Sequence, residues 1–361
     1  TRVVGSSAPP IDGSLPWGRA WHRDKRLVAT DDPGEIRGLL AAADIALVYG
    51  PESLVEDRGL GWGDLQATAP GQVYARCRPS RTATGAVEDY GLLVEARSGF
   101  CTQLAGHRPG PIFVDVRAPG AGAALLLTTS VLALLRRRAL TGDGGWAETS
   151  LYDGMLATLG CMIGRSERAA PEVEGYWERG STFPNFLYRC ADDELLQVWF
   201  GGKGMYPRLL EVLGDEPSSE GYYTDQATGA LRERAERWGS TFATRPRDAW
   251  IAALREAGIA AEPVLGPGEA LADPHVVEIG LARPRSERGH DDVVLATPVS
   301  VLPLVDPPAA GDARPDRAAT LRPAAEVRPS RTGPASALLA GVKVADFSAF
   351  VAGPLAAEVL A

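Results

Sequence analysis

Short apolar runs alternate with helical patterns along the first half of the chain. Residues 45–49 have the apolar pattern of a buried β-strand, residues 112–116 have the same pattern with one Asp at position 115, and residues 73–77 have a weaker form of it. Residues 33–43 predict a helix, because apolar residues recur there at helical spacing and Asp32 is a favourable N-cap. Strands that alternate with helices in this way predict an α/β fold with a parallel sheet.

The pattern changes between residues 187 and 306. Residues 195–199 are strand-like. Amphipathic helical segments follow at residues 205–213, 230–238 and 245–257. Thr244 is the expected cap of the last helix, and Gly258 is its expected stop. This stretch is interpreted as a second, smaller domain.

The pattern predicts four segments. Residues 1–186 form a large α/β domain, and residues 187–304 form the small α+β domain. Residues 305–337 contain recurring Pro, Ala and Arg without an aromatic side chain, which is typical of a solvated linker. Residues 338–361 have the pattern of a strand, a Gly-Pro turn and the start of a helix. This is the usual opening of a nucleotide-binding α/β domain.

Charge and composition exclude some partners. The 361 residues include 37 basic and 46 acidic side chains, a net charge of −9, so nucleic acid is not an expected partner. The arginine run at 136–138 is interpreted as the positive C-terminal turn of a helix. The apolar stretch at 121–135 is shorter than the ~20 residues of a membrane span, so we expect a buried core helix and no membrane partner.

Four cysteines occur without ligand-like spacing, at positions 77, 101, 161 and 190. This spacing predicts neither a metal site nor a disulfide framework. A cytoplasmic location is therefore expected.

Several segments together resemble the family III CoA-transferases (CaiB/BaiF type), which include formyl-CoA transferases, carnitine CoA-transferases and 2-methylacyl-CoA racemases. The resemblance is carried by residues 341–355 (GVKVADFSAFVAGPL), 21–28 (WHRDKRLV), 43–50 (ADIALVYG), 146–154 (WAETSLYDG), 257–264 (AGIAAEPV) and 273–275 (DPH). Each segment alone is a weak signal, but their combined spacing is fairly specific.

The order of these segments is rotated, because the segment at 341–355 resembles the N-terminal signature of the family. Two explanations fit: the chain is a fragment of a tandem protein, or it is circularly permuted. The resemblance implies a Rossmann-like large domain, a smaller domain and an interlocked homodimer or a tandem partner module. It also implies that acyl-CoA and a small carboxylic acid are the substrates, with coenzyme A as the group transferred.

Asp153 matches the family's aspartate nucleophile, which carries CoA as an aspartyl thioester. On a helix that starts near Ser150, Met155 and Leu159 share an apolar face, and Asp153 lies on the opposite, small-residue side. A carboxylate there leaves room for a thioester. The structural alternative is an acidic residue that interacts favourably with the helix N-terminus.

Several residues match CoA-binding segments of the family. Lys25 and Arg26 suit the phosphates of CoA, with a solvated surface pair as the alternative. Gly180 lies where the family places a segment that closes over the aspartate, and Val351 and Ala352 are candidates for backbone contact with CoA. A glycine-rich loop at 201–204 is interpreted as an ordinary turn more readily than as a phosphate loop.

Two segments depart from the family pattern. Its E-N-F after the second strand is replaced by Tyr-Gly-Pro at 49–51, and its S-G-F-G by Arg-Pro-Ser-Arg at 78–81. Arg78 and Arg81 remain candidates for a CoA phosphate. These departures leave open a non-catalytic module that scaffolds a partner. A 2-acyl-CoA racemase is the third hypothesis, although residues 98–107 lack the G-H-D of that branch and His107 is interpreted as a loop residue.

Overall fold

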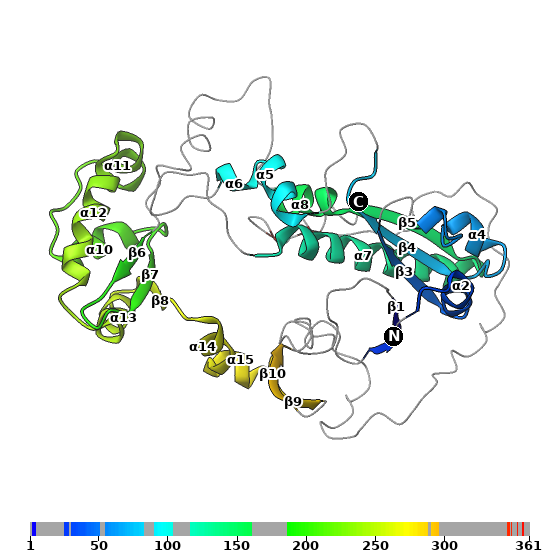
Figure 1. The fold of residues 1–361 in the computed structure, drawn as a ribbon. Helices are drawn as coiled ribbons and strands as arrows, with labels where there is room; N and C mark the ends of the chain where they lie inside the picture. Colours follow the sequence, from blue (N-terminus) through cyan, green and yellow to red (C-terminus); the bar gives the residue numbers. More distant parts are fainter. Residues whose placement is uncertain are drawn as a thin grey trace.

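The structure is a computed structural model (Figure 1). It describes residues 2–4, 25–28, 30–50, 55–82, 90–103, 116–160, 186–287 and 290–295, with single positions at 345, 346, 348, 352 and 356. The linker predicted at 305–337 lies outside the described residues, and so does most of the segment at 338–361. The predicted boundaries of the domains stay predictions.

A three-stranded parallel sheet organises the first half of the chain. Its strands are β3 (Ile45–Tyr49), β4 (Val73–Arg78) and β5 (Gly145–Ser150), in the order β3-β4-β5. The mixed α/β fold with a parallel sheet is confirmed, as are the strands predicted at 45–49 and 73–77. Of the strand predicted at 112–116, only Val116 is described, and it lies in no strand.

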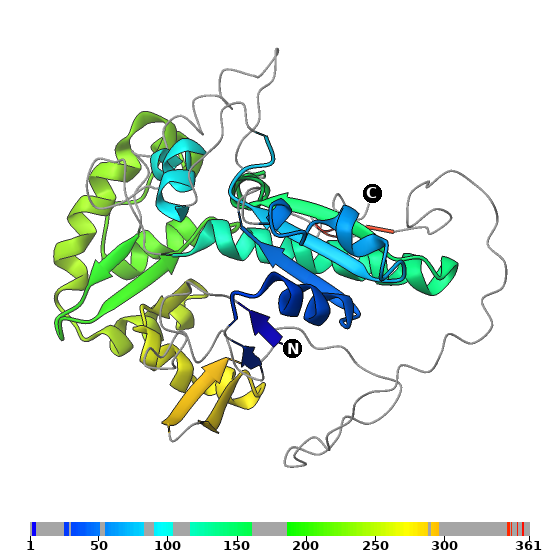
Figure 2. The same cartoon turned by 45° about the vertical axis from the view of Figure 1, so that its right-hand side comes forward.

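Helices cover both faces of this sheet (Figures 1 and 2). On one face lie α2 (Pro33–Ala41) and α4 (Trp62–Gln66), and Trp62 of α4 contacts Tyr74 of β4 with 6.0 Å between ring centroids. Asp32 caps α2 as predicted, because its Oδ1 accepts a hydrogen bond of 2.9 Å from the amide of Gly34. The helix ends two residues before the predicted limit at residue 43.

The long helix α7 (Ala118–Thr141) covers the other face and crosses α8 (Leu151–Leu159). The two backbones meet at Gly122 and Gly154, where a Cβ on either residue would overlap backbone atoms of the other helix. The predicted arginine run lies near the end of α7, which stops at Gly142 with a positive φ of 83°.

The expectation of a buried core helix at 121–135 is only partly met. Ala123 and Leu134 are buried, whereas Leu125 and Leu132 are 70% and 62% exposed. In the described part of the chain, α7 is the one helix with the length and apolar composition of a membrane span, and 22% of its apolar window is buried. Length and composition alone are weak evidence for a span, because core helices also meet them.

Two short helices lie beside the end of α8: α5 (Gly91–Arg97) and α6 (Phe100–Gln103). Val94 of α5 packs with Met155 and Leu159 of α8 in one buried cluster.

A second compact region follows, drawn in green in Figure 1. Its antiparallel sheet has the order β6-β7-β8, and four helices pack with it. The elements are β6 (Leu187–Arg189), β7 (Leu195–Trp199), α10 (Met205–Leu213), α11 (Tyr222–Thr228), α12 (Ala230–Phe242), α13 (Arg247–Glu256) and β8 (Ala260–Pro263). The strand at 195–199 and the helices at 205–213 and 230–238 are confirmed, and the last continues to Phe242.

The predicted start of the helix at 245–257 is wrong by two residues. Its N-cap is Pro246, not Thr244, and the helix begins at Arg247. The residue before a proline is disfavoured in helical geometry, so Arg245 stays outside the helix. Gly258 has a φ of 71°, which suits the predicted stop.

The remaining elements are short. Near the N-terminus, β1 (Arg2–Val4) pairs with β2 (Arg26–Val28) in parallel. After the second region come α14 (Pro267–Ala272), α15 (Pro274–Glu278) and an antiparallel pair, β9 (Ala282–Glu287) and β10 (His290–Leu295).

Candidate active site

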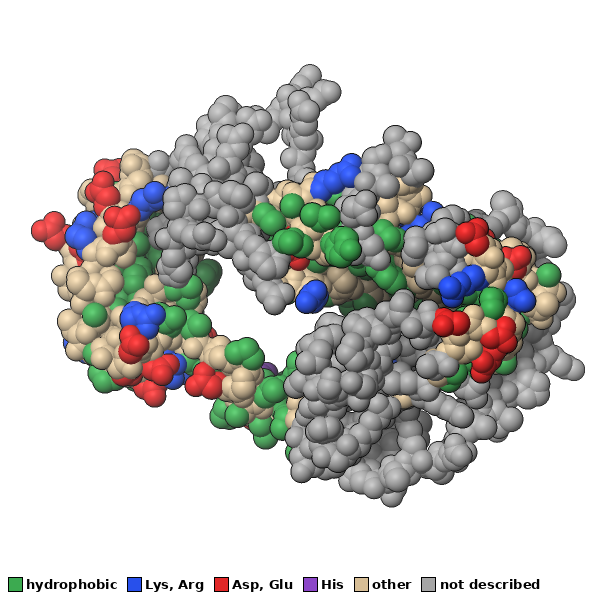
Figure 3. Space-filling model, viewed as in Figure 1, with side chains coloured by type: hydrophobic (Ala, Val, Ile, Leu, Met, Phe, Trp, Pro, Cys, Tyr) green, Lys and Arg blue, Asp and Glu red, His purple; other side chains and the backbone are tan. Residues whose placement is uncertain are grey.

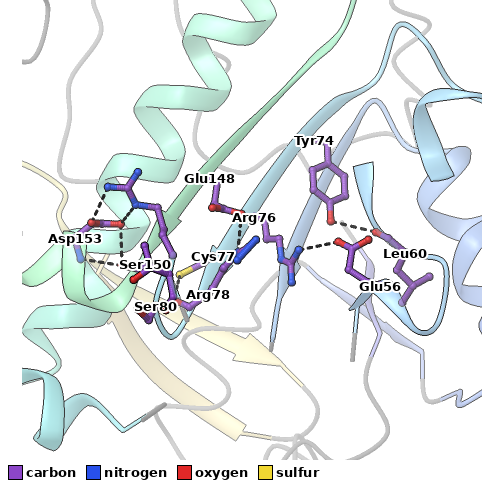
Figure 4. A network of polar contacts seen from close by, with 12 residues as sticks. Glu56, Leu60, Tyr74, Arg76, Cys77, Arg78, Ser80, Glu148, Ser150 and Asp153 are labelled. Carbon is purple, nitrogen blue, oxygen red and sulfur yellow. Dashed lines mark hydrogen bonds and ion pairs between the residues drawn. The ribbon is translucent and has the colours of Figure 1, made fainter. Parts of the chain in front are cut away.

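The candidate site lies where β4 and β5 end. Parallel strands bring their carboxyl ends to one edge of the sheet, and open α/β sheets bind ligands at that edge. The chain passes from the last residue of β5, Ser150, directly into α8, whose first turn carries Asp153. Figure 4 shows Asp153 and Ser150 at one end of a row of polar contacts that follows β4 to Glu56.

Ser150 holds Asp153 in place. Its Oγ accepts a hydrogen bond of 3.0 Å from the Asp153 amide and donates one of 2.8 Å to Asp153 Oδ2. The Ser150 side chain therefore caps α8 and orients the carboxylate at the same time. The N-terminus of α8 also favours a negative charge at this position.

Arg81 binds the same carboxylate through two donors. Its Nε lies 2.6 Å from Asp153 Oδ2, and its Nη2 lies 3.1 Å from Oδ1. The Asp153 side chain is 25% exposed and that of Arg81 is 54% exposed, so the pair faces solvent. The hydrogen bond and the charge of Asp153 raise the pKa of Arg81. The guanidinium thus stays positive in this pair.

Two further arginine–carboxylate pairs lie on one face of β4. Arg78 Nε contacts Glu148 Oε2 of β5 at 2.6 Å, and Arg76 Nη1 contacts Glu56 Oε1 at 2.9 Å. Tyr74, the next residue on this face, donates to the Leu60 carbonyl at 3.1 Å. Burial raises the pKa of Tyr74 to about 12, so its hydroxyl keeps the proton that it donates.

The opposite face of α8 is apolar. Met155 is fully buried and Leu159 is 4% exposed, so the predicted apolar face of this helix is confirmed. Asp153 is on the side that remains accessible. The packing of α8 therefore turns the carboxylate outward.

The other predicted site residues are more scattered. Lys25 is half-buried and lies next to β2, in which Arg26 is paired with Arg2 of β1. Ala352 is exposed. Gly180 and Val351 lie outside the described residues.

The structure thus brings together Asp153, Ser150 and Arg81, whereas Arg78 contacts Glu148. Sequence reasoning took Ser150 only as the start of a helix, although the Ser-x-x-Asp spacing is a capping signal that predicts its contact with Asp153. The pairing of Arg81 with Asp153 joins residues 72 positions apart, and local spacing carries no signal for it. Among the described residues, no three His, Cys, Asp or Glu side chains are grouped to hold a metal ion.

The fold and the site define an α/β protein with an oriented, accessible carboxylate at the strand edge. A family model described as CoA-transferase family III matches residues 1–310. This chain belongs to CoA-transferase family III.

Two curated relatives at low identity are named as CoA-transferases. Succinyl-CoA–D-citramalate CoA-transferase of Chloroflexus aurantiacus is 23% identical over 286 residues, which cover 73% of this chain and 69% of the relative. Succinyl-CoA:mesaconate CoA-transferase of Haloarcula marismortui is 22% identical over 296 residues, covering 78% and 73%. The family and these relatives support a transferase that acts on CoA thioesters.

Solved structures share the fold. The crystal structure of Rv3272 from Mycobacterium tuberculosis has a TM-score of 0.66 at 18% identity and covers 83% of this chain and 85% of its own. A CAIB/BAIF family protein from Brucella suis has a TM-score of 0.62 at 20% identity and covers 78% and 76%.

Proposed function

We propose that this chain is an acyl-CoA:carboxylate CoA-transferase that carries CoA on Asp153. One observation carries the proposal: Asp153 is oriented by Ser150 and remains 25% exposed at the carboxyl edge of the parallel sheet. A carboxylate held in a fixed direction and open to solvent has what a nucleophile needs. Membership of the CoA-transferase family supplies the thioester that it would attack.

The transfer divides into balanced steps. The Asp153 carboxylate attacks the thioester carbonyl of the acyl-CoA, forms an anhydride and releases CoA thiolate. The thiolate attacks the aspartyl carbonyl, which leaves an aspartyl-CoA thioester and frees the donor acid as a carboxylate. An acceptor carboxylate then runs both steps in reverse. Each step consumes one anion, a carboxylate or a thiolate, and releases the other, so the total charge stays the same and no proton is consumed.

The surrounding residues suit this chemistry. Ser150 fixes Oδ2 of Asp153 by donating its hydroxyl hydrogen, and Arg81 holds both carboxylate oxygens in one plane. We further propose that Lys25, Arg26, Gly180, Val351 and Ala352 contact CoA, as the resemblance of their segments implies. Arg78 is held by Glu148, so a contact with a CoA phosphate would require it to share or leave that partner.

The relatives suggest the first substrates to test. Both are named for succinyl-CoA as donor, and their acceptors are named as D-citramalate and mesaconate. We propose a short dicarboxylic acyl-CoA as donor and a short carboxylic acid as acceptor. The proposed location is the cytoplasm.

The exposed apolar side chains support a homodimer. Figure 3 shows hydrophobic side chains gathered over the region of α5, α7 and α8. The large exposed residues of these helices are Leu92, Leu93, Leu125, Leu132, Leu140 and Leu156. Apolar side chains grouped on a surface mark interaction sites. We propose that a second copy, or a tandem module of the same family, covers them.

Replacing Asp153 tests the proposed function. With succinyl-CoA and an isotopically labelled acceptor acid, we expect Asp153→Ala and Asp153→Asn to lose roughly 1,000-fold or more of the exchange rate, because neither residue can form the anhydride. Circular dichroism should stay unchanged. Asp143→Asn, at an exposed position outside the site, is the matched control. Undiminished exchange in both Asp153 variants would contradict the proposal.

The same assays separate the alternatives. A folded wild-type protein that shows no CoA binding in a calorimetric titration would favour the non-catalytic scaffold. Deuterium incorporation at the α-carbon of a 2-methylacyl-CoA, without exchange of acids, would favour the racemase.

A further inference from the structure

We propose that Arg81 is the receptor for the carboxylate of the reacting acid, and that Asp153 occupies this receptor whenever the enzyme carries no CoA. The inference rests on the proposed function, because it concerns the state in which Asp153 is a thioester. In this inference Arg81 binds the acid substrate. From the sequence, Arg81 was instead a candidate for binding a phosphate of CoA.

The geometry makes Arg81 a preformed carboxylate site. Its Nε and Nη2 contact the two oxygens of one carboxylate at 2.6 and 3.1 Å, the paired arrangement by which arginine recognises this group. The side chain of Arg81 is 54% exposed, so an acid from solvent has access to it. The carboxylate that now fills the site is that of Asp153, the nucleophile proposed above.

The charge balance of the reaction empties and refills this site. When Asp153 becomes a thioester it loses its negative charge, and Arg81 loses its ionic partner. In the same step the donor acid is released as a carboxylate next to Asp153. The guanidinium can therefore pass from one carboxylate to the other without being left unpaired, and then hold the acceptor acid for attack on the thioester.

The neighbouring arginines do not share this property. Arg78 and Arg76 pair with Glu148 and Glu56, whose charges the reaction leaves unchanged. Arg78 is also 21% exposed and Arg76 only 5% in their side chains. Within this row of three pairs, Arg81 has the partner that the reaction neutralises.

The shape of CoA also separates Arg81 from the phosphates. The reacting sulfur lies at one end of the pantetheine arm, and the phosphates lie beyond the other end. An arginine that touches the carboxylate attacking the thioester is a full arm's length from the phosphates of an extended CoA. Recognition of the acid is therefore the role that fits its position.

A binding experiment tests this without catalysis. Asp153→Asn removes the charge that occupies Arg81, so by calorimetry succinate should bind this variant roughly 10- to 100-fold more tightly than the wild type. Acetate, with a single carboxylate, should show the same direction. Adding Arg81→Gln to Asp153→Asn should abolish the gain. Adding Arg37→Gln, an exposed arginine of α2 that contacts the Arg58 carbonyl, should preserve it.

Equal affinity of the wild type and Asp153→Asn for succinate would overturn the inference, and so would a gain that survives Arg81→Gln. A kinetic measurement adds a second criterion. In Arg81→Gln the KM for the acceptor acid should rise about 10- to 100-fold with a smaller change in the KM for acyl-CoA, and Arg81→Lys should fall between it and the wild type. A rise confined to the KM for acyl-CoA would overturn the inference in favour of CoA binding.

The two proposals fail in different ways. Absence of CoA exchange in the wild-type protein would sink the proposed function, and with it the assignment of Arg81 to an acid substrate. Exchange that depends on Asp153 but shows neither the affinity gain nor the selective rise in KM would leave the proposed function standing and sink the inference alone.

Discussion

The region from β6 to β8 and the region around the parallel sheet bury their apolar side chains in different ways. The first encloses one continuous core, in which Trp238, Phe242 and Trp250 are each at most 2% exposed. In the second, the residues that the structure describes form small separate clusters, and large apolar residues such as Leu125 and Trp146 are more than half exposed. Both regions expose some large apolar side chains, such as Trp199 in the first, so the difference lies in the size of the core that their described residues form.

Each region contains both enclosed and exposed ion pairs, and one pair from each shows what accessibility allows. In the first region Asp215 and Arg234 form an ion pair of 3.0 Å, and both side chains are about 15% exposed. In the second region the pair of Asp153 and Arg81 is accessible. Enclosed charges stabilise a fold through fixed hydrogen bonds, whereas an accessible pair can exchange partners. The pair of Asp215 and Arg234 is therefore held within the fold, whereas the pair at the sheet edge is one that a substrate can reach.

The largest expected effect concerns the enclosed core. Trp250 packs against Phe242 and donates its indole N–H to the Phe242 carbonyl at 2.8 Å. Trp250→Ala should destabilise this region by about 3–5 kcal/mol, because it leaves a cavity and an unpaired carbonyl. Hydrogen exchange of peptides should show lost protection between residues 186 and 263 and retained protection between 118 and 160.

Trp199→Ala is the matched control for that experiment. Trp199 is 56% exposed, so its removal should cost about 1 kcal/mol or less. Equal loss of protection in both regions on Trp250→Ala would break the comparison, because the two would then unfold as one unit.

An intermediate effect is expected where α7 crosses α8. A methyl group at Gly154 would overlap the Ala123 amide and the Pro119 carbonyl, so Gly154→Ala must shift α8. We expect a loss of about 1–3 kcal/mol from overpacking. The rate of CoA exchange should fall as well, because α8 carries Asp153.

Gly38→Ala provides the control for the glycine substitution. Gly38 lies inside α2, and a Cβ added there would meet open space, so alanine should be neutral or stabilise by about 0.4–1 kcal/mol. If Gly154→Ala preserved both stability and exchange, the close crossing of α7 and α8 would not be what holds Asp153.

The smallest expected effect is a dependence on pH. Burial acts to raise the pKa of Asp215, but hydrogen bonds from Trp238 and Arg234 outweigh it and leave the pKa below its usual 3.8. A lowered pKa in the folded state means that this stabilisation is present above about pH 4 and is lost as the pH falls further. The thermal stability of the wild type relative to Asp215→Asn should therefore shrink below that pH.

Asp193→Asn is the matched control for this pH series. Its carboxylate is 86% exposed in a pair with Arg189 at 2.9 Å, so its removal should change stability little at any pH. A constant difference between the wild type and Asp215→Asn from pH 7 down to pH 3 would contradict the role of Asp215.

Local patterns predicted much of the fold. The strands at 45–49 and 195–199 and the helix at 205–213 have the bounds that their apolar periodicity indicates. The exposure of α7 could not be predicted from its sequence, because a helix with an apolar sequence can be either buried or exposed within its own chain. The start of α13 was missed because the restriction before Pro246 outweighed a favourable cap at Thr244.

The site was predictable only in part. Asp153 was predicted from the resemblance of its segment, whereas Ser150 was predicted only as the start of a helix and not as a partner of Asp153. The pairing of Arg81 with Asp153 depends on the register of β4 and β5, which brings the ends of both strands to one edge. That register is a tertiary property, and no spacing within either segment encodes it.

The most direct test of the central claim is the mass of the protein after exposure to acyl-CoA. Wild-type protein incubated with succinyl-CoA in the absence of acceptor acid, and then digested, should yield the peptide containing Asp153 with CoA bound as a thioester. Hydroxylamine should remove the CoA, and Asp153→Asn should carry none. CoA attached at another residue, or an unmodified peptide from a protein that exchanges acids at full rate, would contradict the account.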